Sequence, residues 1–191
     1  MKILVYIQSD GDSILRSSLE ALAGAQKLAS EVDGEIAVVC YNSSLNNKLN
    51  EYKITEVINL DNSELNNYSP LNFIAAMQQI IEDTNPNIVI FGHTYQVRDW
   101  VPRLSARLDI SFISDCIALE TTEGLIGIRQ AYQGKINTKI STNGLIFISF
   151  QSGAFRADAI EEGSANIRNF DIDLSSVPTT IRPGEKFKES K

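Results

Sequence analysis

The sequence predicts an α/β fold in which a mainly parallel sheet carries an antiparallel extension in the second half of the chain. Up to residue 119, apolar runs that suit strands alternate with amphipathic stretches that suit helices, a rhythm typical of parallel sheets with right-handed crossovers. After residue 119, the apolar runs are separated only by turn residues, which indicates antiparallel strands. We expect one domain over residues 1–173, followed by a linker or tail over residues 174–191.

The composition narrows the class of protein. With 43% hydrophobic and 21% charged residues, the 191-residue chain has the balance of an ordinary globular domain. Its net charge of −7 argues against a nucleic-acid surface, which needs clustered positive charge. No apolar run approaches the roughly 20 residues of a membrane helix, and the N-terminus leads straight into a strand. Cys40 and Cys116 lie in apolar runs, so we expect buried, reduced thiols of a cytoplasmic protein.

The first half contains four predicted strands and their connecting helices. After the first strand, apolar residues recur at helical spacing, and we expect Asp12 or Ser13 to cap the start of that helix. The polar stretch of residues 42–51 is compatible with a short helix. The predicted strands are residues 2–8, 35–41, 55–60 and 88–91, and the predicted helices are residues 15–29 and 70–83.

The second half contains strands in close succession. We expect three of them, over residues 125–131, 135–140 and 145–150, after a turn at residues 121–124. Thr142-Asn143-Gly144 is a hairpin signal, which predicts that the last two strands are antiparallel neighbours. Residues 160–171 are expected to add a strand at an edge of the sheet.

The stretch from Ile88 to Leu119 organises the rest of the chain. It predicts a strand buried on both faces, a polar loop, a helix that begins near Asp99, and a second buried strand interrupted by Ser114-Asp115. Pro102 suits the first turn of this helix, where its missing N–H costs nothing. Asp99 suits the positive end of the helix dipole and lies one turn before Arg103.

The loop before this helix is where we look for chemistry, because ligands of open α/β sheets lie at the carboxyl ends of strands. It holds the only histidine of the chain, His93, together with Tyr95 and Arg98. The sequence lacks a G-x-G-x-x-G loop, a Walker lysine loop and a G-x-S-x-G elbow. Asp10 and Asp12 fit turn and cap roles better than acid–base catalysis. We therefore expect no catalytic, cofactor-binding or metal-binding residue in this chain.

Three ordered segments resemble the electron transfer flavoprotein alpha subunit in its N-terminal domain. The family carries a small-residue loop, a basic residue and Asp, Pro-Arg-hydrophobic-small-Ala within a helix, and then a Ser-Asp pair near the next strand. It also carries an Arg-Pro-x-Tyr-x-Gly-Asn turn and a Thr-Val-Arg-x-x-Ala-Phe strand end. The matching segments here are Gly92 to Asp115, Arg129 to Lys135 and Phe150 to Phe155, with Gln130 in place of the family's Pro and Lys135 in place of its Asn.

The resemblance implies a three-layer, Rossmann-like fold of the adenine-nucleotide alpha-hydrolase type. It implies a heterodimer with a beta subunit, which holds AMP, and electron transfer from acyl-CoA dehydrogenases toward the quinone pool. FAD lies in the alpha subunit's C-terminal domain, on a Ser-Gly-Gly-Arg-type loop that this sequence lacks, so we expect no FAD on this chain alone. The motif residues are expected to shape the domain and its partner contact: Arg98, Asp99, Pro102, Arg103, Asp115, Arg129, Tyr132 and Gly134.

Two other hypotheses stay open at this point. One is a small adenine-nucleotide-binding protein of the same fold class, which would use the crevice between residues 9–13 and residues 92–99. The other is a stand-alone homo-oligomeric domain that pairs with itself and binds no flavin. A hydrolase is a more distant alternative.

Overall fold

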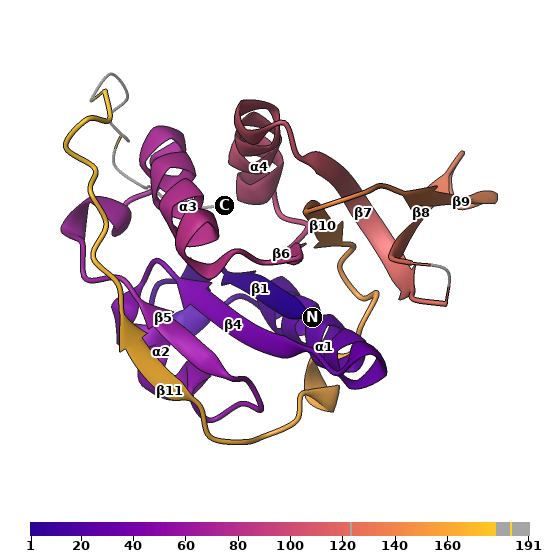
Figure 1. Cartoon of the computed structure of the whole chain (residues 1–191), viewed down its shortest axis with the longest axis horizontal. Helices are drawn as coiled ribbons and strands as arrows, with labels where there is room; N and C mark the ends of the chain where they lie inside the picture. The colour runs from indigo at the N-terminus through magenta and orange to yellow at the C-terminus, as the bar shows by residue number, and fades with distance from the viewer. Residues whose placement is uncertain (123, 179–183, 185–191) are drawn as a thin grey trace, which may run out of the picture.

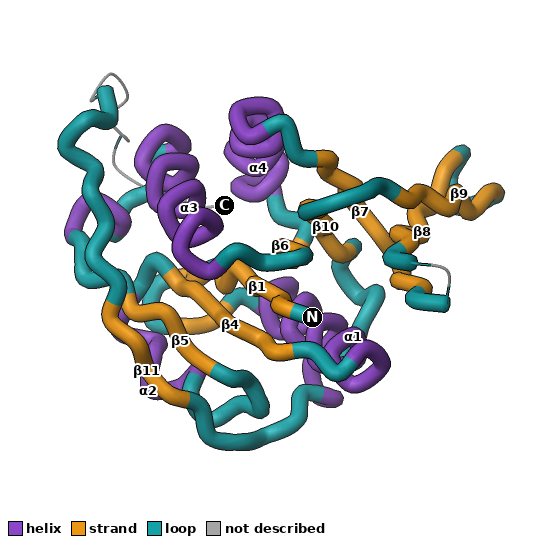
Figure 2. Tube along the Cα trace, in the orientation of Figure 1, coloured by secondary structure: helices purple, strands orange, loops and turns teal. Residues whose placement is uncertain are grey.

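A nine-stranded sheet lies between two layers of helices in the computed structural model, which describes residues 1–122, 124–178 and 184 (Figure 1 and Figure 2). The strands of this sheet are β1 (Lys2–Ile7), β4 (Glu35–Cys40), β5 (Glu56–Asn59), β6 (Ile88–Gly92), β7 (Ser111–Glu120), β8 (Ile126–Ala131), β9 (Ile136–Ser141), β10 (Ile146–Phe150) and β11 (Asn166–Asn169). The helices are α1 (Arg16–Val32), α2 (Asn46–Leu49), α3 (Pro70–Thr84) and α4 (Tyr95–Leu108).

The strand order is β11-β5-β4-β1-β6-β10-β7-β8-β9. Every neighbouring pair from β11 to β7 is parallel, whereas β8 and β9 join as antiparallel strands at one edge. The predicted α/β class, with a mainly parallel sheet and an antiparallel extension, is therefore confirmed. Strand β11 at the opposite edge confirms the edge strand expected within residues 160–171, and α2 confirms the short helix expected within residues 42–51.

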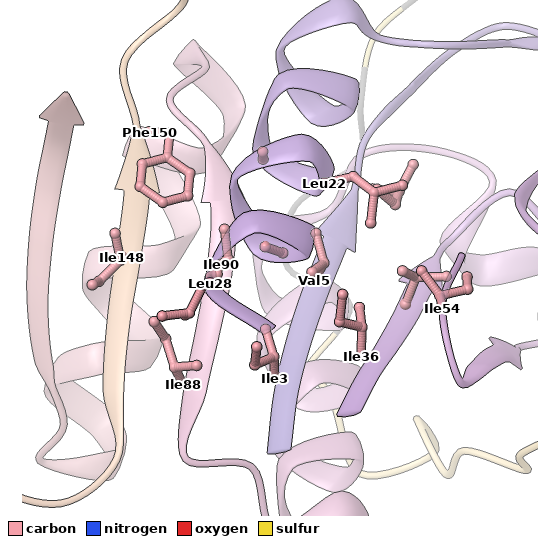
Figure 3. Packing of buried hydrophobic residues seen from close by; sticks show 14 of the residues in the cluster. Ile3, Val5, Leu22, Leu28, Ile36, Ile54, Ile88, Ile90, Ile148 and Phe150 are labelled. Carbon is pink, nitrogen blue, oxygen red and sulfur yellow. The ribbon is translucent and has the colours of Figure 1, made fainter. Parts of the chain in front are cut away.

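One face of the sheet packs against α1 and α2. Ile3 and Val5 of β1 point toward this layer and lie in one apolar cluster with Leu22 and Leu28 of α1 (Figure 3). All four side chains are at most 2% exposed. Because successive strand residues face opposite sides, Leu4 lies in the other cluster.

The opposite face packs against α3 and α4 around Trp100, which is fully buried. Its indole ring lies 5.2 Å from the ring of Tyr6 and 5.7 Å from that of Phe91, both in edge-on contact. Phe73 of α3 contacts the indole from 6.0 Å. Trp100 therefore has a packing role in the core, whereas Tyr95, one turn earlier on α4, is 88% exposed.

The predicted hairpin at Thr142-Asn143-Gly144 is wrong. Strand β9 pairs only with β8 among the described strands, and the chain then crosses back so that β10 enters between β6 and β7, parallel to both. The reason is burial, because all five residues of β10 are buried. Such a strand fits only in the interior of a sheet covered on both faces.

The start of α4 also differs from the prediction. The helix begins at Tyr95, because the Thr94 hydroxyl accepts a hydrogen bond from the Val97 N–H at 3.1 Å and caps it. Pro102 consequently lies inside the helix and not in its first turn, and Asp99 is no longer at the helix start. The predicted pair one turn apart is nevertheless present, with Arg103 Nη2 2.7 Å from Asp99 Oδ1.

The cap predicted for α1 is wrong as well. Residues 9–14 form a small antiparallel hairpin, in which Asp10 pairs with Ser13, so these side chains precede the helix rather than cap it. The residue before the helix is Leu15, which makes no side-chain cap. Its N–H donates to the Gln8 carbonyl at 2.9 Å.

No helix in the described ranges is both long and apolar enough to cross a membrane. At the end of the described chain, the Asp173 N–H donates to Gln79 Oε1 of α3 at 2.9 Å, and Leu174 is 5% exposed. Most of the expected linker or tail lies outside the described residues, as does Glu123 in the turn expected at residues 121–124.

The close approach of β6 to α1 predicts that Gly92→Ala destabilises the protein. A Cβ at this position would lie 2.6 Å from the Ser17 carbonyl oxygen, which belongs to the backbone of α1. We expect the free energy of unfolding in urea to fall by about 1–3 kcal/mol. Gly184→Ala is the control, because open space surrounds Gly184, and an equal loss in both variants would contradict the prediction.

The interior position of Pro102 predicts that Pro102→Ala stabilises the protein. Pro102 is exposed and lies inside α4, so alanine restores a backbone donor without losing core packing. Proline in a helix interior destabilises the folded state by about 3 kcal/mol. Proline also restricts the unfolded chain, which offsets roughly 1 kcal/mol of this loss. We expect a net gain of about 1–2 kcal/mol by urea unfolding, whereas Pro178→Ala, outside any helix, has only the effect on the unfolded chain and should lose up to about 1 kcal/mol.

Candidate functional site

The carboxyl ends of β1 and β6 meet where the order of the strands reverses. From β1 the chain continues to β4 on one side, and from β6 it continues through α4 to β7 on the other side. Open α/β sheets bind ligands at such a switch point. The two loops singled out from the sequence, residues 9–13 and 92–99, both lie at this edge.

The chain's own side chains bridge the crevice between these loops. Thr94 Oγ1 donates to Gln8 Oε1 at 2.7 Å, and the Tyr6 hydroxyl donates to Gln96 Oε1 at 3.2 Å. These bonds join the end of β1 to the start of α4. A ligand that enters between β1 and β6 would have to replace both of these hydrogen bonds.

A pocket of about 380 Å³ remains beside this bridge, at the ends of β1 and β4. Tyr6, Tyr41 and Phe73 contribute aromatic walls, and the carboxylate of Asp12 lies at its border. The residues that line it include no lysine or arginine. A phosphate group needs cations or a cradle of backbone donors, so this pocket does not fit a phosphate-bearing nucleotide.

His93 follows β6 and is held by β10 and β7. Its backbone N–H donates to the Phe150 carbonyl at 2.9 Å, and its Nδ1 lies 2.9 Å from Ser149 Oγ. The Ser149 hydroxyl accepts the Asp115 N–H at 3.1 Å, which leaves its own hydrogen for Nδ1. The imidazole proton is then assigned to Nε2, which lies 3.9 Å from Asp115 Oδ1.

A bulge in β7 places Asp115 beside His93. Asp115 has φ 61°, and the pairing register of β7 against β10 shifts between Ile113 and Cys116. This is the interruption at Ser114-Asp115 that the sequence predicts. Because the bulge re-aims the side chain, the Asp115 carboxylate lies next to the imidazole, while its N–H remains bonded to Ser149.

Burial lowers the pKa of His93, so the ring is neutral at pH 7. The carboxylate of Asp115 opposes this effect and raises the pKa, whereas the guanidinium groups of Arg98 and Arg129 lower it further. Ser149 is fully buried, which keeps its hydroxyl away from any substrate. Although Ser149, His93 and Asp115 are neighbours, their arrangement suits the fixing of three strands better than nucleophilic catalysis.

The motif residues fall into three groups in space. Asp115 lies beside His93, and Arg98 and Arg129 are near enough to lower its pKa. On α4, Asp99 pairs with Arg103 and accepts the Tyr68 hydroxyl at 2.5 Å, which ties the loop before α3 to this helix. In a third place, Tyr132 and Gly134 form the turn between β8 and β9, with φ 51° and 81°.

Two buried polar residues hold the site together, although no clear pattern in the sequence indicates them. Glu20 of α1 is 2% exposed, accepts the Gly153 N–H at 2.8 Å and pairs with Arg16 at 3.1 Å. Ser149 stands alone in an apolar strand. The only signals in the sequence are the four-residue spacing of Arg16 and Glu20 and the single hydroxyl within residues 145–150.

The cysteines are buried thiols, as expected. Burial raises the pKa of Cys40 to about 11 and that of Cys116 to about 12, so neither is a thiolate near pH 7. Within residues 1–122, 124–178 and 184, no three His, Cys, Asp or Glu side chains gather as a metal site requires.

Comparison with known families gives this arrangement its context. A family model described as the electron transfer flavoprotein domain matches residues 3–175, which is nearly the whole described chain. The chain belongs to the electron transfer flavoprotein family. The resemblance to the N-terminal domain of its alpha subunit, inferred from three short segments, is thereby confirmed along with the family.

Curated relatives are electron transfer flavoprotein alpha subunits. The chain is 29% identical to subunit alpha of Bacillus subtilis, over 95% of this chain and 57% of the relative. It is 26% identical to subunit alpha of Syntrophomonas wolfei, over 73% and 44%. A probable mitochondrial subunit alpha of Cryptococcus neoformans is 28% identical, over 92% and 52%. The chain thus spans about half the length of these members of the electron transfer flavoprotein family.

The surroundings of His93 predict how this single histidine titrates. We expect its pKa, followed by NMR of the imidazole, to lie below the usual value of about 6.5. Asp115→Asn should lower this pKa further because it removes the opposing charge, and Asn tolerates the left-handed backbone of Asp115. Arg98→Gln should raise it, because a like charge is lost. A rise in Asp115→Asn would contradict the proposed arrangement.

The same pKa predicts a dependence of stability on pH. The folded state holds His93 neutral, so its contribution to stability is complete above the unfolded pKa of about 6.5. It is lost as the pH falls below that value toward the lowered folded-state pKa. Urea unfolding from pH 7.5 to pH 5 should show this loss, and His93→Gln, which cannot titrate, should show less of it.

Proposed function

We propose that this chain acts as the N-terminal scaffold of an electron transfer flavoprotein alpha subunit. In this role it packs against a beta subunit and supports the domain that carries FAD. The assembly would pass electrons from flavin dehydrogenases of the acyl-CoA dehydrogenase type, as in fatty acid β-oxidation, toward the quinone pool. The match of the family model over residues 3–175 carries the proposal, and in this proposal the chain is part of an electron carrier and not an enzyme.

The polar groups at the switch point support a scaffold role better than a flavin-binding role. FAD carries a pyrophosphate, which requires cations or aligned backbone donors, and the pocket at β1 and β4 offers a carboxylate instead. In a flavoprotein the flavin performs the electron transfer, while the protein supplies position and electrostatics. We assign FAD to the C-terminal domain of the alpha subunit, as the family resemblance implies.

The β8–β9 hairpin is our candidate for the partner surface. It projects from the side of the domain beyond the helical layers (Figure 1). Two of the most exposed apolar side chains lie on it, with Tyr132 78% and Ile136 52% exposed. Exposed aromatic and aliphatic side chains together are typical of protein contacts. The motif residues Arg98, Asp99, Pro102 and Arg103 on α4 are assigned the same role.

The domain boundary follows from the same proposal. Leu174 and Val177 still pack on the apolar cluster that includes α3, and we assign residues 174–191 to the linker or tail that follows the domain. We assign the protein to the cytoplasm, where thiols such as those of Cys40 and Cys116 stay reduced.

The partner assignment predicts that the hairpin is required for assembly. Tyr132→Asn combined with Ile136→Thr should weaken binding of the beta subunit at least tenfold, measured by calorimetry, because both apolar contacts are lost. Asn suits the positive φ of Tyr132 and Thr suits a strand. Ile167→Thr is the control, since Ile167 is 40% exposed on β11 at the other edge of the sheet. Unchanged binding by the hairpin variant would reject this surface.

The cofactor assignment predicts a colourless protein. The purified chain should show no flavin absorbance, and added FAD should elute separately in gel filtration. Yellow colour should appear only when the FAD domain is supplied as well. Tight, stoichiometric binding of FAD by this chain alone would contradict the assignment, whatever the outcome of the hairpin experiment.

The adenine-nucleotide hypothesis has less support, because no basic side chain lines the pocket beside Asp12. AMP or ATP released from the purified protein on denaturation would revive it. For the homo-oligomer hypothesis, a symmetric dimer in sedimentation that persists when the beta subunit is added would favour self-association over the scaffold role.

A further inference from the structure

A second pocket lies on the other side of the bridge between β1 and β6. It has a volume of about 510 Å³ and is bounded by the segment Leu15–Ser17 at the start of α1 and by residues 93–95 and Arg98. Ser152, after β10, closes one side. Unlike the pocket beside Asp12, this one is lined by two arginines, Arg16 and Arg98, and by the histidine.

The charges around this pocket are unusual for a protein of net charge −7. Arg103, Arg156, Arg168 and Arg16 each pair with a carboxylate within 4.0 Å. Among the arginines in the described ranges, Arg98, Arg107 and Arg129 have no such partner. Arg98 lines this pocket together with His93, and Arg129 is near enough to lower the pKa of His93. Arginines beside one another repel, so their convergence indicates that an anion offsets the charge.

The sheet fixes the position of Arg129 in this group. The His93 N–H donates to the Phe150 carbonyl, Phe150 is paired with Cys116, and Cys116 is paired with Arg129. His93 therefore directly follows the row of Gly92, Phe150, Cys116 and Arg129, which crosses four strands. Arg98 approaches the same histidine from α4, where its guanidinium lies 5.6 Å from the ring centre of Tyr95.

Acidic groups near the pocket are already engaged. Glu20 binds Arg16, the Gly153 N–H and the Ser152 hydroxyl. Asp115 lies 3.9 Å from His93 Nε2 and accepts from Gln151 Nε2 at 3.5 Å. With Arg16 neutralised by Glu20, the remaining charges are Arg98, Arg129 and Asp115, a net positive group. The hydroxyl oxygen of Ser17, which also lines the pocket, is buried without a hydrogen-bond partner.

We propose that this pocket binds a small oxyanion, a phosphate or carboxylate group of a small molecule, through Arg98 with Arg129 and His93 behind it. Arg98 supplies the charged, forked donor that such groups prefer. His93 donates its Nε2 proton to the anion when the Asp115 carboxylate moves away from Nε2 or accepts the same proton. The assignment goes beyond the scaffold role, and it is tested on this chain without the beta subunit or the FAD domain, so its outcome is distinct from that of the hairpin experiment.

The single histidine of the chain makes the test direct. Imidazole signals of His93 in the full chain are followed by NMR while sodium sulfate replaces sodium chloride at constant ionic strength. We expect a saturable shift and a rise in the pKa of His93, since a bound anion favours the imidazolium form. Parallel titrations with phosphate and acetate distinguish a dianionic phosphate-type ligand from a carboxylate, and saturable binding of either one supports the site.

Matched variants separate a defined site from general attraction of anions. Arg98→Gln should weaken sulfate binding about tenfold and Arg129→Gln several-fold. Arg107→Gln is the control, because Arg107 is also exposed and lacks an ion pair in the described part of the chain but lies at the far end of α4. A linear, non-saturating shift overturns the proposal, and so does an equal weakening by Arg107→Gln. Unchanged thermal midpoints exclude unfolding as the cause of any loss.

Discussion

Burial of β10 on both of its faces is the constraint on which the rest of the structure depends. The strand can satisfy its backbone groups only between two partners, and it finds them in β6 and β7. Its insertion extends the parallel part of the sheet and leaves β8 and β9 outside as an antiparallel hairpin. The position of that hairpin, and hence the shape of the side of the domain, follows from one five-residue strand.

The same strand assembles the polar site. Phe150 receives the His93 N–H, and the buried hydroxyl of Ser149 contacts the imidazole and the backbone of Asp115. Beyond the strand, the Gly153 N–H reaches Glu20 in α1. Three segments distant in sequence are thus fixed by hydrogen bonds to residues 149–153. Ser149, Phe150 and Glu20 are buried, which makes their hydrogen bonds stronger and the loss of any one more costly.

Periodicity in the sequence was sufficient to predict the strands and long helices and the switch from a parallel to an antiparallel arrangement. It failed where a distant contact overrode a local signal. Thr142-Asn143-Gly144 has the chemistry of a tight turn, but the burial of β10 decides its partners. Pro102 has the chemistry of a helix start, but Thr94 caps α4 earlier. Within the site, the location of His93 was predictable, whereas the contacts of Ser149 and Glu20 depend on tertiary packing that no local pattern encodes.

The insertion of β10 also constrains the order of events during synthesis. When residues 88–120 have emerged from the ribosome, β6 and β7 are both present, yet they lie on either side of a position that only residues 146–150 can fill. A nascent chain that ends before Ile146 exposes two facing strand edges, which invites pairing with other chains. The strands from β1 to β7 become continuous only after residues 146–150 have been made. Between the emergence of β7 and that of β10, nascent-chain surveillance therefore has an opportunity to act on these two unpaired edges.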